Sequence, residues 1–478
     1  MTTTLQRQIE IYPVTRIEGH GKVTLHLGDD GRVNDAWFQV TQFRGFEKLA
    51  VGRPFSEMPS LTARTCGICP VSHLIAASKA CDGLLAVEIP AAAVKLRKVV
   101  NLAQILQSHA LAFFYLSSPD LLLGMDSDPD KRNLFGVLEK HPDVARDGIG
   151  LRKFGQEIIE WLAGKRIHPA WIVPGGVNKP LERDVRDRIL AQIPEAKRAV
   201  LRSLESYKIA AAAMADEIDG FGTFPSLFMG MVGPNGELEH YDGLLRVIDS
   251  SGQVIADKLD TRDYEQFLEE RIEPYSFLKS PFYKPLGYEN GMYRTGPLAR
   301  LNVVSSCGTP LADRELLDFP GRGAGPQLGS FHYHHARLIE ILYCLERLEE
   351  LLGSDDVLSP RVRAAAGPNR LEAVGCSEAP RGLLWHHYKI DEAGLVTWAN
   401  MIIATGNNNL ALNKGVLMTA QNFVDGKNIQ EGMLNRVEAV VRAYDPCLSC
   451  STHAVGQMPL RVELRGPDGE LLDEAVRG

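Results

Sequence analysis

Two Cys-x-x-Cys pairs near opposite ends of the chain are the strongest chemical feature of this sequence. Cys66 and Cys69 form the first pair, and Cys447 and Cys450 form the second. Two intervening residues allow both sulfurs of a pair to reach one metal from a turn or from the start of a helix. A single pair could also be two small buried residues or a redox dithiol, but two pairs indicate one site with four sulfurs. Four thiolates point first to zinc or to an iron–sulfur centre.

The separation of the pairs favours a catalytic centre over a small structural zinc site. Structural zinc sites usually take their ligands from neighbouring sequence, whereas almost the whole chain separates these pairs. The protein core would therefore enclose the site. Pro70 predicts a helix start beside Cys69, where the helix dipole favours a thiolate. His73, four residues after Cys69, would lie on the same helical face and could hydrogen-bond that sulfur.

The elements that must position these residues are predicted to be mainly helical. Apolar spacing predicts long helices, and β-forming runs joined by turn residues predict hairpins. The helices are expected over residues 71–85, 91–116, 181–221 with a break at Ile193-Pro194, 328–352 and 429–444. The strands are expected over residues 8–12, 22–27 and 33–40, with further hairpins over 244–259 and 383–403. The predicted fold is mainly α with peripheral β (α+β): a large single domain with a core of long helices, an N-terminal β-hairpin sheet and small inserted hairpins.

Composition narrows the possible classes of protein. The chain has 478 residues, of which 45% are hydrophobic and 23% charged, and a formal charge of −8. These values exclude collagen-like, disordered and disulfide-scaffold proteins, and the negative charge argues against a general nucleic-acid binder. No apolar run approaches the roughly 20 residues that span a bilayer, and the first residues lack the apolar stretch of a signal peptide. We therefore expect a cytoplasmic protein without a membrane span.

Several motifs, taken together, resemble the large subunit of [NiFe] hydrogenases over almost the whole chain. They are the two cysteine pairs and the segments Pro13–His20, Arg44–Glu47 and Glu378–Gly382. The sequence from Cys66 to His73 and the stretch 378–390 most resemble the cytoplasmic bidirectional, NAD-linked branch. The resemblance implies reversible oxidation of H₂ to protons and electrons at a NiFe(CN)₂CO centre.

The resemblance also implies partners. Electrons would leave through an iron–sulfur small subunit to flavin- and NAD-binding diaphorase subunits that hold FeS, FMN and NAD. This chain itself has no further cysteine cluster for an iron–sulfur chain and no Gly-x-Gly-x-x-Gly motif for NAD.

The resemblance assigns roles to individual residues. Cys66 and Cys447 would bind nickel terminally, and Cys69 and Cys450 would bridge nickel to iron. Glu18 would be the first proton acceptor from the nickel thiolate. Arg381, in the motif with Pro380, would hydrogen-bond one cyanide, and Thr405 would donate to the other, although Ala404 replaces the usual proline before it. Ser108 stands where many membrane-linked relatives have an aspartate.

The same resemblance places a magnesium or similar cation at Glu47 and His453. Such a site keeps several waters and needs few protein ligands. Spacing alone leaves simpler alternatives open: a salt bridge from Glu47 to Lys48 or Arg53, and an Arg16–Glu18 pair on one face of a strand. Arg381 alone could be a turn arginine held by a carboxylate.

Other histidines and cysteines are expected to pack in the core. The histidines are His332, His334, His335, His386 and His387, and the unpaired cysteines are Cys81, Cys307, Cys344 and Cys376. A histidine cluster can bind a metal, but the four-sulfur site is complete without them. Unpaired cysteines behave by default as small buried hydrophobes.

Residues 454–478 follow His453 and are predicted to form a hairpin over 461–465 and 470–476. In the resembled family the precursor is cut after this histidine once nickel is in place. The chain would thus divide into a hydrogenase domain, 1–453, and a C-terminal extension, 454–478, with a nickel-insertion chaperone and a maturation endopeptidase as further partners. We expect the uncut extension to hold Cys447 and Cys450 away from closure and the full-length chain to be inactive.

Three alternative functions stay open from the sequence. The quinone-side subunit of respiratory complex I shares the ancestry but lacks the cysteine pairs. Another hydrogenase branch would use a deazaflavin or a different acceptor. A scaffold protein with structural zinc is the non-enzyme alternative.

Overall fold

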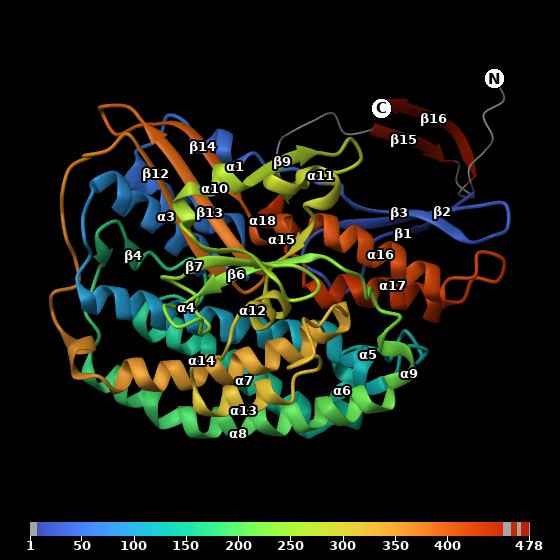
Figure 1. The fold of residues 1–478 in the computed structure, drawn as a ribbon, viewed down its shortest axis with the longest axis horizontal. Coiled ribbons are helices and arrows are strands. Elements are labelled where there is room, and N and C mark those ends of the chain that lie inside the picture. Colours follow the sequence, from blue (N-terminus) through green and yellow to red (C-terminus); the bar gives the residue numbers. More distant parts are fainter. Residues whose placement is uncertain (1–6, 453–459, 466–469, 478) are drawn as a thin grey trace.

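The computed structural model describes residues 7–452, 460–465 and 470–477. A layer of long helices forms one side of the molecule (the lower half of Figure 1), and small sheets and short helices cover it. The long helices are α4 (Ala91–Leu111), α7 (Pro142–Ala163), α8 (Arg183–Ala213) and α14 (Tyr333–Gly353), which pack against one another. Helices α3 (Pro70–Leu85), α16 (Asn409–Phe423) and α17 (Glu431–Tyr444) lie nearer the sheets. The predicted α+β class with a core of long helices is confirmed.

Helix α4 shows why this sequence forms a buried helical core. Its apolar side chains at positions 96, 99, 103, 106 and 110 recur at helical spacing and are all buried. A π-helical turn, Ala112–Ser117, and α5 (Ser118–Leu123) continue it. The expectation that no apolar run approaches the length of a membrane span is wrong, because the stretch Ala91–Leu123 is long and apolar enough to cross a membrane. However, 83% of its most apolar window lies inside the protein. This helical stretch is therefore the central helix of the packed core.

The predicted break at Ile193-Pro194 is wrong, because α8 runs without interruption from Arg183 to Ala213. Proline removes one backbone donor and displaces the carbonyl four residues earlier. Pro194 is exposed, so water can satisfy that carbonyl, while the opposite face of α8 packs on α7 and α14. The helical region also ends earlier than predicted, and the short α9 (Ala215–Ile218) follows it.

Antiparallel pairing of neighbouring strands confirms the three predicted hairpin regions. The strands β1 (Gln8–Ile11), β2 (Gly21–Leu27) and β3 (Val33–Val40) form the N-terminal sheet. β7 (Leu244–Ile248) pairs with β8 (Val254–Leu259) in a sheet that also contains β6 (Leu227–Val232) and β11 (Tyr293–Arg294). β13 (Gly382–Ile390) lies between β14 (Val396–Ile402) and the unpredicted β12 (Glu372–Ala379), and α3 packs on β12 and β13.

Short elements complete the chain. The helices are α1 (Phe46–Ala50), α2 (Met58–Thr62), α6 (Leu134–Lys140), α10 (Tyr264–Phe267), α11 (Gly287–Asn290), α12 (Pro297–Val303), α13 (Pro310–Leu317), α15 (Ala404–Asn407) and α18 (Leu448–Ser451). The strands are β4 (Ile172–Val173), β5 (Gly176–Val177), β9 (Leu268–Ile272) and β10 (Lys279–Tyr283). The C-terminal strands β15 (Leu460–Arg465) and β16 (Leu471–Arg477) pair antiparallel, which confirms the hairpin predicted in the extension.

Candidate metal centre

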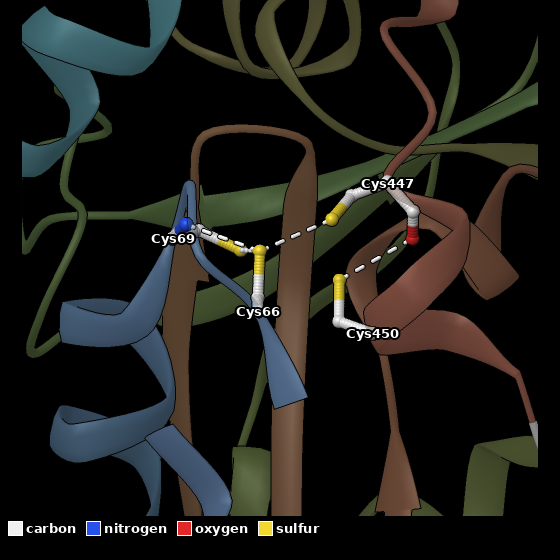
Figure 2. Close-up of side chains that lie close together, drawn as sticks. All are labelled: Cys66, Cys69, Cys447 and Cys450. Atoms are coloured by element: carbon white, nitrogen blue, oxygen red, sulfur yellow. Dashed lines mark hydrogen bonds between the residues drawn. The ribbon is translucent and has the colours of Figure 1, made fainter. Parts of the chain in front are cut away.

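The four cysteine sulfurs meet at one buried point, as the spacing of the pairs predicts. Their Sγ atoms all lie within 4.8 Å of one another. Cys66 Sγ lies 3.2 Å from Cys69 Sγ and 3.2 Å from Cys447 Sγ, and Cys450 completes the group (Figure 2). All four are free thiols. Among the described residues this is the one group of histidines, cysteines or carboxylates with metal-site geometry.

The early pair is held largely by its own turn and by α4. Cys69 is the N-cap of α3, with Pro70 in the first turn. The backbone N–H groups of Ile68 and Cys69 both donate to Cys66 Sγ at 3.2 Å. The short Cys-x-x-Cys segment therefore supplies its own hydrogen bonds.

Two glutamines and a histidine that the sequence did not single out support this turn. Gln104 and Gln107 of α4 donate side-chain amides to the carbonyl of Ile68 at 2.6 and 2.7 Å. His168 Nε2 lies 2.9 Å from the carbonyl oxygen of Cys66. Both glutamines lie on one face of α4 at i and i+3 spacing, which is the one sequence feature that could have identified them.

The late pair depends on residues that are far away in the sequence. Glu18 and Cys447 form an isolated parallel β-bridge, and Leu448 N–H donates to the Glu18 carbonyl at 3.0 Å. Cys447 N–H donates to Thr405 Oγ1 at 2.9 Å. The Cys450 thiol donates to the carbonyl of Cys447 at 3.3 Å.

The four thiols do not ionise alike. Hydrogen bonds from Cys447, Cys450 and Cys66 lower the pKa of Cys69 well below the ordinary thiol value, and His73 adds to this effect. Burial raises the pKa of Cys447 and of Cys450 well above that value. Without a metal, Cys69 is thus the favoured thiolate, and a bound cation must displace protons from the late pair.

The carboxylate of Glu18 faces the late pair. Its Oε2 accepts the Cys447 thiol at 3.1 Å and the backbone N–H of Ser449 at 3.0 Å, and the residue is half-buried. The prediction that Glu18 and Arg16 share one face of a strand is wrong. Strand β1 ends at Ile11, and Arg16 has a left-handed backbone (φ +54°). Arg16 consequently points away from Glu18 and binds Asp120 at 2.5 Å.

Arg381 lies in the tight turn between β12 and β13. Its Nη2 donates to Asp445 Oδ1 at 3.0 Å, its Nε donates to the Asp445 carbonyl, and its Nη1 lies 3.4 Å from Ser108 Oγ. The side chain is therefore both a turn arginine held by a carboxylate and a buried cation beside the cysteine segment. Pro380 precedes it, and the Pro380 carbonyl accepts Arg300 Nη2 at 3.3 Å.

Arg300 belongs to a fully buried ion network that the sequence did not reveal. It binds Glu340 through two N–H···O bonds of 2.6 Å and Glu378 through one of 2.8 Å. Its Nη1 also donates to the Ala379 carbonyl at 3.0 Å. Because buried ion pairs are costly unless fully hydrogen-bonded, this complete set of partners fixes the backbone that leads to Arg381.

Thr405 contacts the late pair, and His73 lies in the first turns of α3, beside the early pair. The Thr405 hydroxyl accepts from Cys447, which leaves its own proton available for another acceptor. His73 is fully buried, and its Nδ1 lies 3.1 Å from His386 Nε2. His386 therefore forms part of the surroundings of α3, with its Nδ1 2.5 Å from the hydroxyl of Tyr388.

The remaining histidines and cysteines pack in the core, as predicted. His332, His334 and His335 are buried, and desolvation lowers the pKa of each, to about 4 for His332 and about 3 for His335. His387 contacts Tyr264 and Glu372. The cysteines at 81, 307, 344 and 376 are buried, and burial raises their pKa.

Glu47 lies near Lys279, with its Oε1 3.9 Å from Nζ. Arg53 lies 3.7 Å from Glu57. His453 lies outside the described residues. Its neighbour Thr452 forms a β-bridge with Leu278, so the end of the cysteine segment lies beside the strand that carries Lys279.

The extension does not separate the two pairs. The four sulfurs lie within 4.8 Å of one another while β15 and β16 are part of the same chain. The prediction that an uncut extension keeps the late pair from closing is therefore wrong for this structure. The Glu18 and Thr405 contacts hold Cys447 within the described part of the chain.

Comparison with protein families gives two adjoining matches. Residues 8–43 match a model described as HoxL-like, and residues 44–128 and 249–453 match the model described as nickel-dependent hydrogenase. The chain is 42% identical to the NAD-reducing hydrogenase HoxS subunit beta of Cupriavidus necator, covering 99% of this chain and 100% of the relative. It is 39% identical to an F420-non-reducing hydrogenase (vhc) subunit of Methanococcus voltae, covering 95% and 96%.

Solved structures give the same result. A crystal structure of an NAD⁺-reducing [NiFe]-hydrogenase in the H₂-reduced state matches with a TM-score of 0.90 and 42% identity, over 94% of this chain and 99% of that one. A Ni-Fe-Se hydrogenase from D. vulgaris Hildenborough matches with a TM-score of 0.77 at 23% identity, over 94% and 100%, which supports the fold alone.

Proposed function

The chain belongs to the nickel-dependent hydrogenase family, and from this premise we propose that it is the hydrogen-activating large subunit of an NAD-linked enzyme. The reaction is the reversible oxidation of H₂ to protons and electrons. The observation that carries the proposal is the convergence of four buried thiols from opposite ends of the chain within 4.8 Å. Full-length similarity to an NAD-reducing hydrogenase subunit supports the choice of branch.

The donor set fits a nickel–iron pair. Soft thiolates select redox-active and soft metals, and all four cysteines are buried. Cys66, Cys69, Cys447 and Cys450 would hold this pair, and the iron would carry one CO and two CN ligands. When bound, this centre supplies heterolytic cleavage of H₂ and takes up its two electrons.

The chain provides the first step of proton removal. Cys447 Sγ can hold a proton and pass it to Glu18 Oε2, 3.1 Å away. The N–H of Ser449 holds the same oxygen in place. Because Glu18 is half-buried while Cys447 is fully buried, the carboxylate lies between the site and the outside.

Three further side chains would orient and shield the diatomic ligands. The Arg381 guanidinium, beside Pro380, is a planar cationic donor suited to an anionic cyanide. The Thr405 hydroxyl keeps its proton free for the second cyanide. His73, at the start of α3, would interact with the Cys69 sulfur. Burial of all three side chains keeps competing water away.

Glu47 and His453 would hold a magnesium or similar cation near the end of the mature chain. The support is the β-bridge from Thr452 to Leu278, next to the Lys279 that now pairs with Glu47. A bound dication repels an ammonium group, so Lys279 would have to turn away when the site is filled. Metal analysis of a Glu47→Gln variant tests this assignment.

The electrons require partner subunits. The described cysteines outside the centre are buried singly. We therefore propose a cytoplasmic hetero-oligomer in which a flavin- and NAD-binding diaphorase joins this chain through an iron–sulfur small subunit, the partners carrying FeS, FMN and NAD. The alternative is a branch with a deazaflavin or another acceptor; the relative with 39% identity is named for not reducing the deazaflavin F420, so it favours another acceptor. The purified complex, supplied with H₂, should reduce NAD⁺; reduction of the deazaflavin or of an added iron–sulfur protein without reduction of NAD⁺ would favour the alternative branch.

Maturation would follow the division into residues 1–453 and 454–478. The extension forms its own hairpin, so an endopeptidase could remove it after a chaperone has delivered nickel. Intact mass and nickel content of the active complex test this division. Full activity in a chain that retains the hairpin would refute it.

Infrared spectroscopy of the purified complex tests the centre itself. CO and CN stretching bands together with stoichiometric nickel are expected. Zinc in place of nickel, with no such bands, would support the scaffold alternative.

A further inference from the structure

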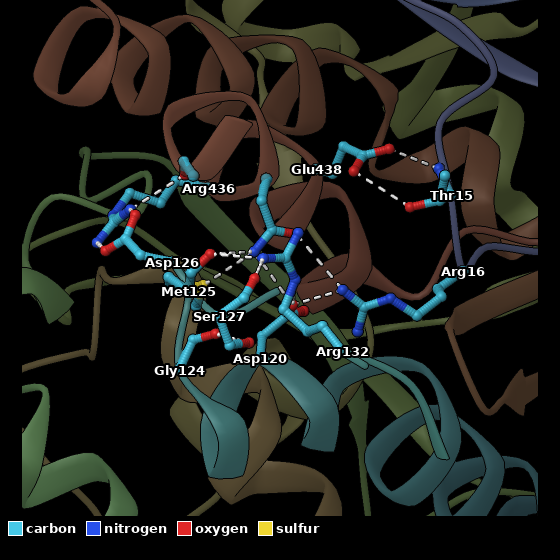
Figure 3. A network of polar contacts seen from close by, with 12 residues as sticks. Thr15, Arg16, Asp120, Gly124, Met125, Asp126, Ser127, Arg132, Arg436 and Glu438 are labelled. Atoms are coloured by element: carbon cyan, nitrogen blue, oxygen red, sulfur yellow. Dashed lines mark hydrogen bonds and ion pairs between the residues drawn. The ribbon is translucent and has the colours of Figure 1, made fainter. Parts of the chain in front are cut away.

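One buried carboxylate, Asp120 of α5, joins the two segments that bring Glu18 and Cys447 together. Its Oδ1 accepts Arg16 Nη2 at 2.5 Å, and its Oδ2 accepts Arg442 Nε at 3.0 Å. The Asp120 side chain is only 3% exposed. Figure 3 shows Asp120 at the centre of a polar network that extends to Thr15 and Arg16 on one side. No step of the proposed reaction uses this group.

The first segment leads to Glu18. Arg16 turns the chain through its left-handed backbone, and its Nη1 also donates to the Leu116 carbonyl at 2.7 Å. Leu116 belongs to the π-helical turn Ala112–Ser117, which interrupts the regular α-helical bonding. Glu18 follows two residues later and binds the segment of Cys447. Asp120 and Leu116 therefore fix the position of Arg16 and, with it, the start of the segment that carries Glu18.

The second segment leads to Cys447. Arg442 lies in the last turn of α17, five residues before Cys447, and is fully buried. Its Nη2 donates to Asn435 Oδ1 at 2.6 Å, and its Nη1 donates to the Thr15 carbonyl at 3.2 Å. Asn435 Nδ2 in turn donates to Asp120 Oδ1 at 3.2 Å. Asp120 thus contacts both segments, and Arg442 links the two segments directly through its bond to Thr15.

Charge makes Asp120 different from an ordinary ion pair. Three guanidinium groups face it, because Arg132 Nε also lies 3.5 Å from its Oδ1. Removing one partner of a buried ion pair leaves charges without compensation. Here the loss of the Asp120 charge would leave Arg16 without its carboxylate and Arg442 with Glu438 alone, 3.5 Å away. The two cations, one on each segment, would then repel each other more strongly.

We propose that Asp120 is a positioning residue that sets the distance between Cys447 Sγ and Glu18 Oε2. The proposal rests on the proposed function, in which a proton passes between these atoms. The S–H bond breaks, an O–H bond forms on Glu18, and the electron pair stays on sulfur. Asp120 takes no part in that transfer. It acts by holding the segments that carry Glu18 and Cys447 in place.

An Asp120→Asn variant of the full chain, purified in its complex, tests the proposal. Hydrogen exchange measured by mass spectrometry should be faster at the amides of Leu448 and Ser449, which donate to Glu18. A change of about tenfold or more is expected, since tenfold corresponds to about 1.4 kcal/mol of local stability. Nickel content should stay unchanged, while the D₂O isotope effect on H₂ oxidation should rise because proton transfer becomes limiting. The exchange readout requires no activity, so it separates this proposal from the proposed function.

Asp82→Asn is the matched control. It also leaves a fully buried guanidinium, Arg97, without its carboxylate partner at 2.6 Å, but on α3 and α4. The exchange rates at 448 and 449 and the isotope effect should not change in this control. If both variants accelerate exchange throughout the chain to the same extent, Asp120 is only structural and the proposal is wrong.

Arg16→Met serves if the Asp120 variant does not assemble. It removes the bond from Arg16 to Asp120 at a half-buried position. The loss of folding stability should therefore be smaller than in Asp120→Asn. The same local acceleration at 448 and 449 is expected. Unchanged exchange and an unchanged isotope effect in this variant would overturn the proposal.

Discussion

The early and late cysteine pairs have the same spacing but are held in different ways. Cys66 receives two N–H donors from its own turn, and α4 supports that turn through Gln104 and Gln107. Cys447 is held by Glu18 and Thr405, which are 429 and 42 positions away. The early pair is therefore formed by local structure, whereas the late pair exists only when the whole chain has closed around it.

The two pairs also differ in the pKa of their thiols. The early pair contains the thiol whose pKa is lowered, Cys69, and both thiols of the late pair have raised pKa values. A cation bound by the late pair would have to displace protons from it.

The largest effect is expected from removing one sulfur of the late pair. Cys447→Ser should lose activity by more than about a hundredfold, because even residues that only orient metal ligands contribute about 10–100-fold. Nickel should be absent from the purified complex by elemental analysis. Cys66→Ser is the companion variant from the early pair. If Cys447→Ser kept nickel and Cys66→Ser lost it, the late pair would not be part of the nickel site.

Glu18→Gln should separate proton transfer from metal binding. The amide oxygen can still accept the Ser449 N–H, but the side chain cannot take up a proton at that oxygen. H₂ oxidation should fall by about 10²–10⁴-fold, the range for losing a positioned acid–base group, with nickel retained. Turnover assays beside infrared spectra measure both. Glu18→Asp should recover part of the rate, and normal turnover in Glu18→Gln would exclude this carboxylate from the proton path.

Arg381→Lys should have an intermediate effect, because lysine keeps the charge but loses the planar set of donors. The bonds to Asp445 and the contact to Ser108 cannot all be reproduced by one ammonium group. Activity is expected to fall by about 10–100-fold, and the cyanide stretching bands should shift. Bands at unchanged positions would show that Arg381 does not touch the cyanides.

The smallest effect is expected at the support of the early pair. Gln104→Ala combined with Gln107→Ala leaves the Ile68 carbonyl without two side-chain donors and should cost about 1–3 kcal/mol of stability. Thermal unfolding should show a lower Tm, while activity per bound nickel should change only slightly, because the Cys66 turn keeps its own N–H donors. A loss as large as that of Glu18→Gln would mean that the early pair is not locally formed.

Local patterns predicted much of the fold. The helix expected over 71–85 is α3, Pro70–Leu85, and the N-terminal strands have nearly the predicted bounds. Helical spacing and turn residues act over a few positions, so they are visible in sequence. The same reasoning failed at Pro194, where exposure and packing on neighbouring helices override a local helix breaker. It also missed β12, whose place is set by pairing with β13 and packing under α3.

The sequence by itself determined which donors this protein has: four sulfurs in two pairs, an acidic residue in the N-terminal motif and an arginine in the turn at 381. Only the tertiary structure decided which of them meet. It placed Glu18 against Cys447, sent Arg16 to Asp120 and set Arg381 on Asp445. The physical reason is that spacing along the chain constrains neighbours within a few residues, whereas contacts across hundreds of residues form only through the packing of the complete core.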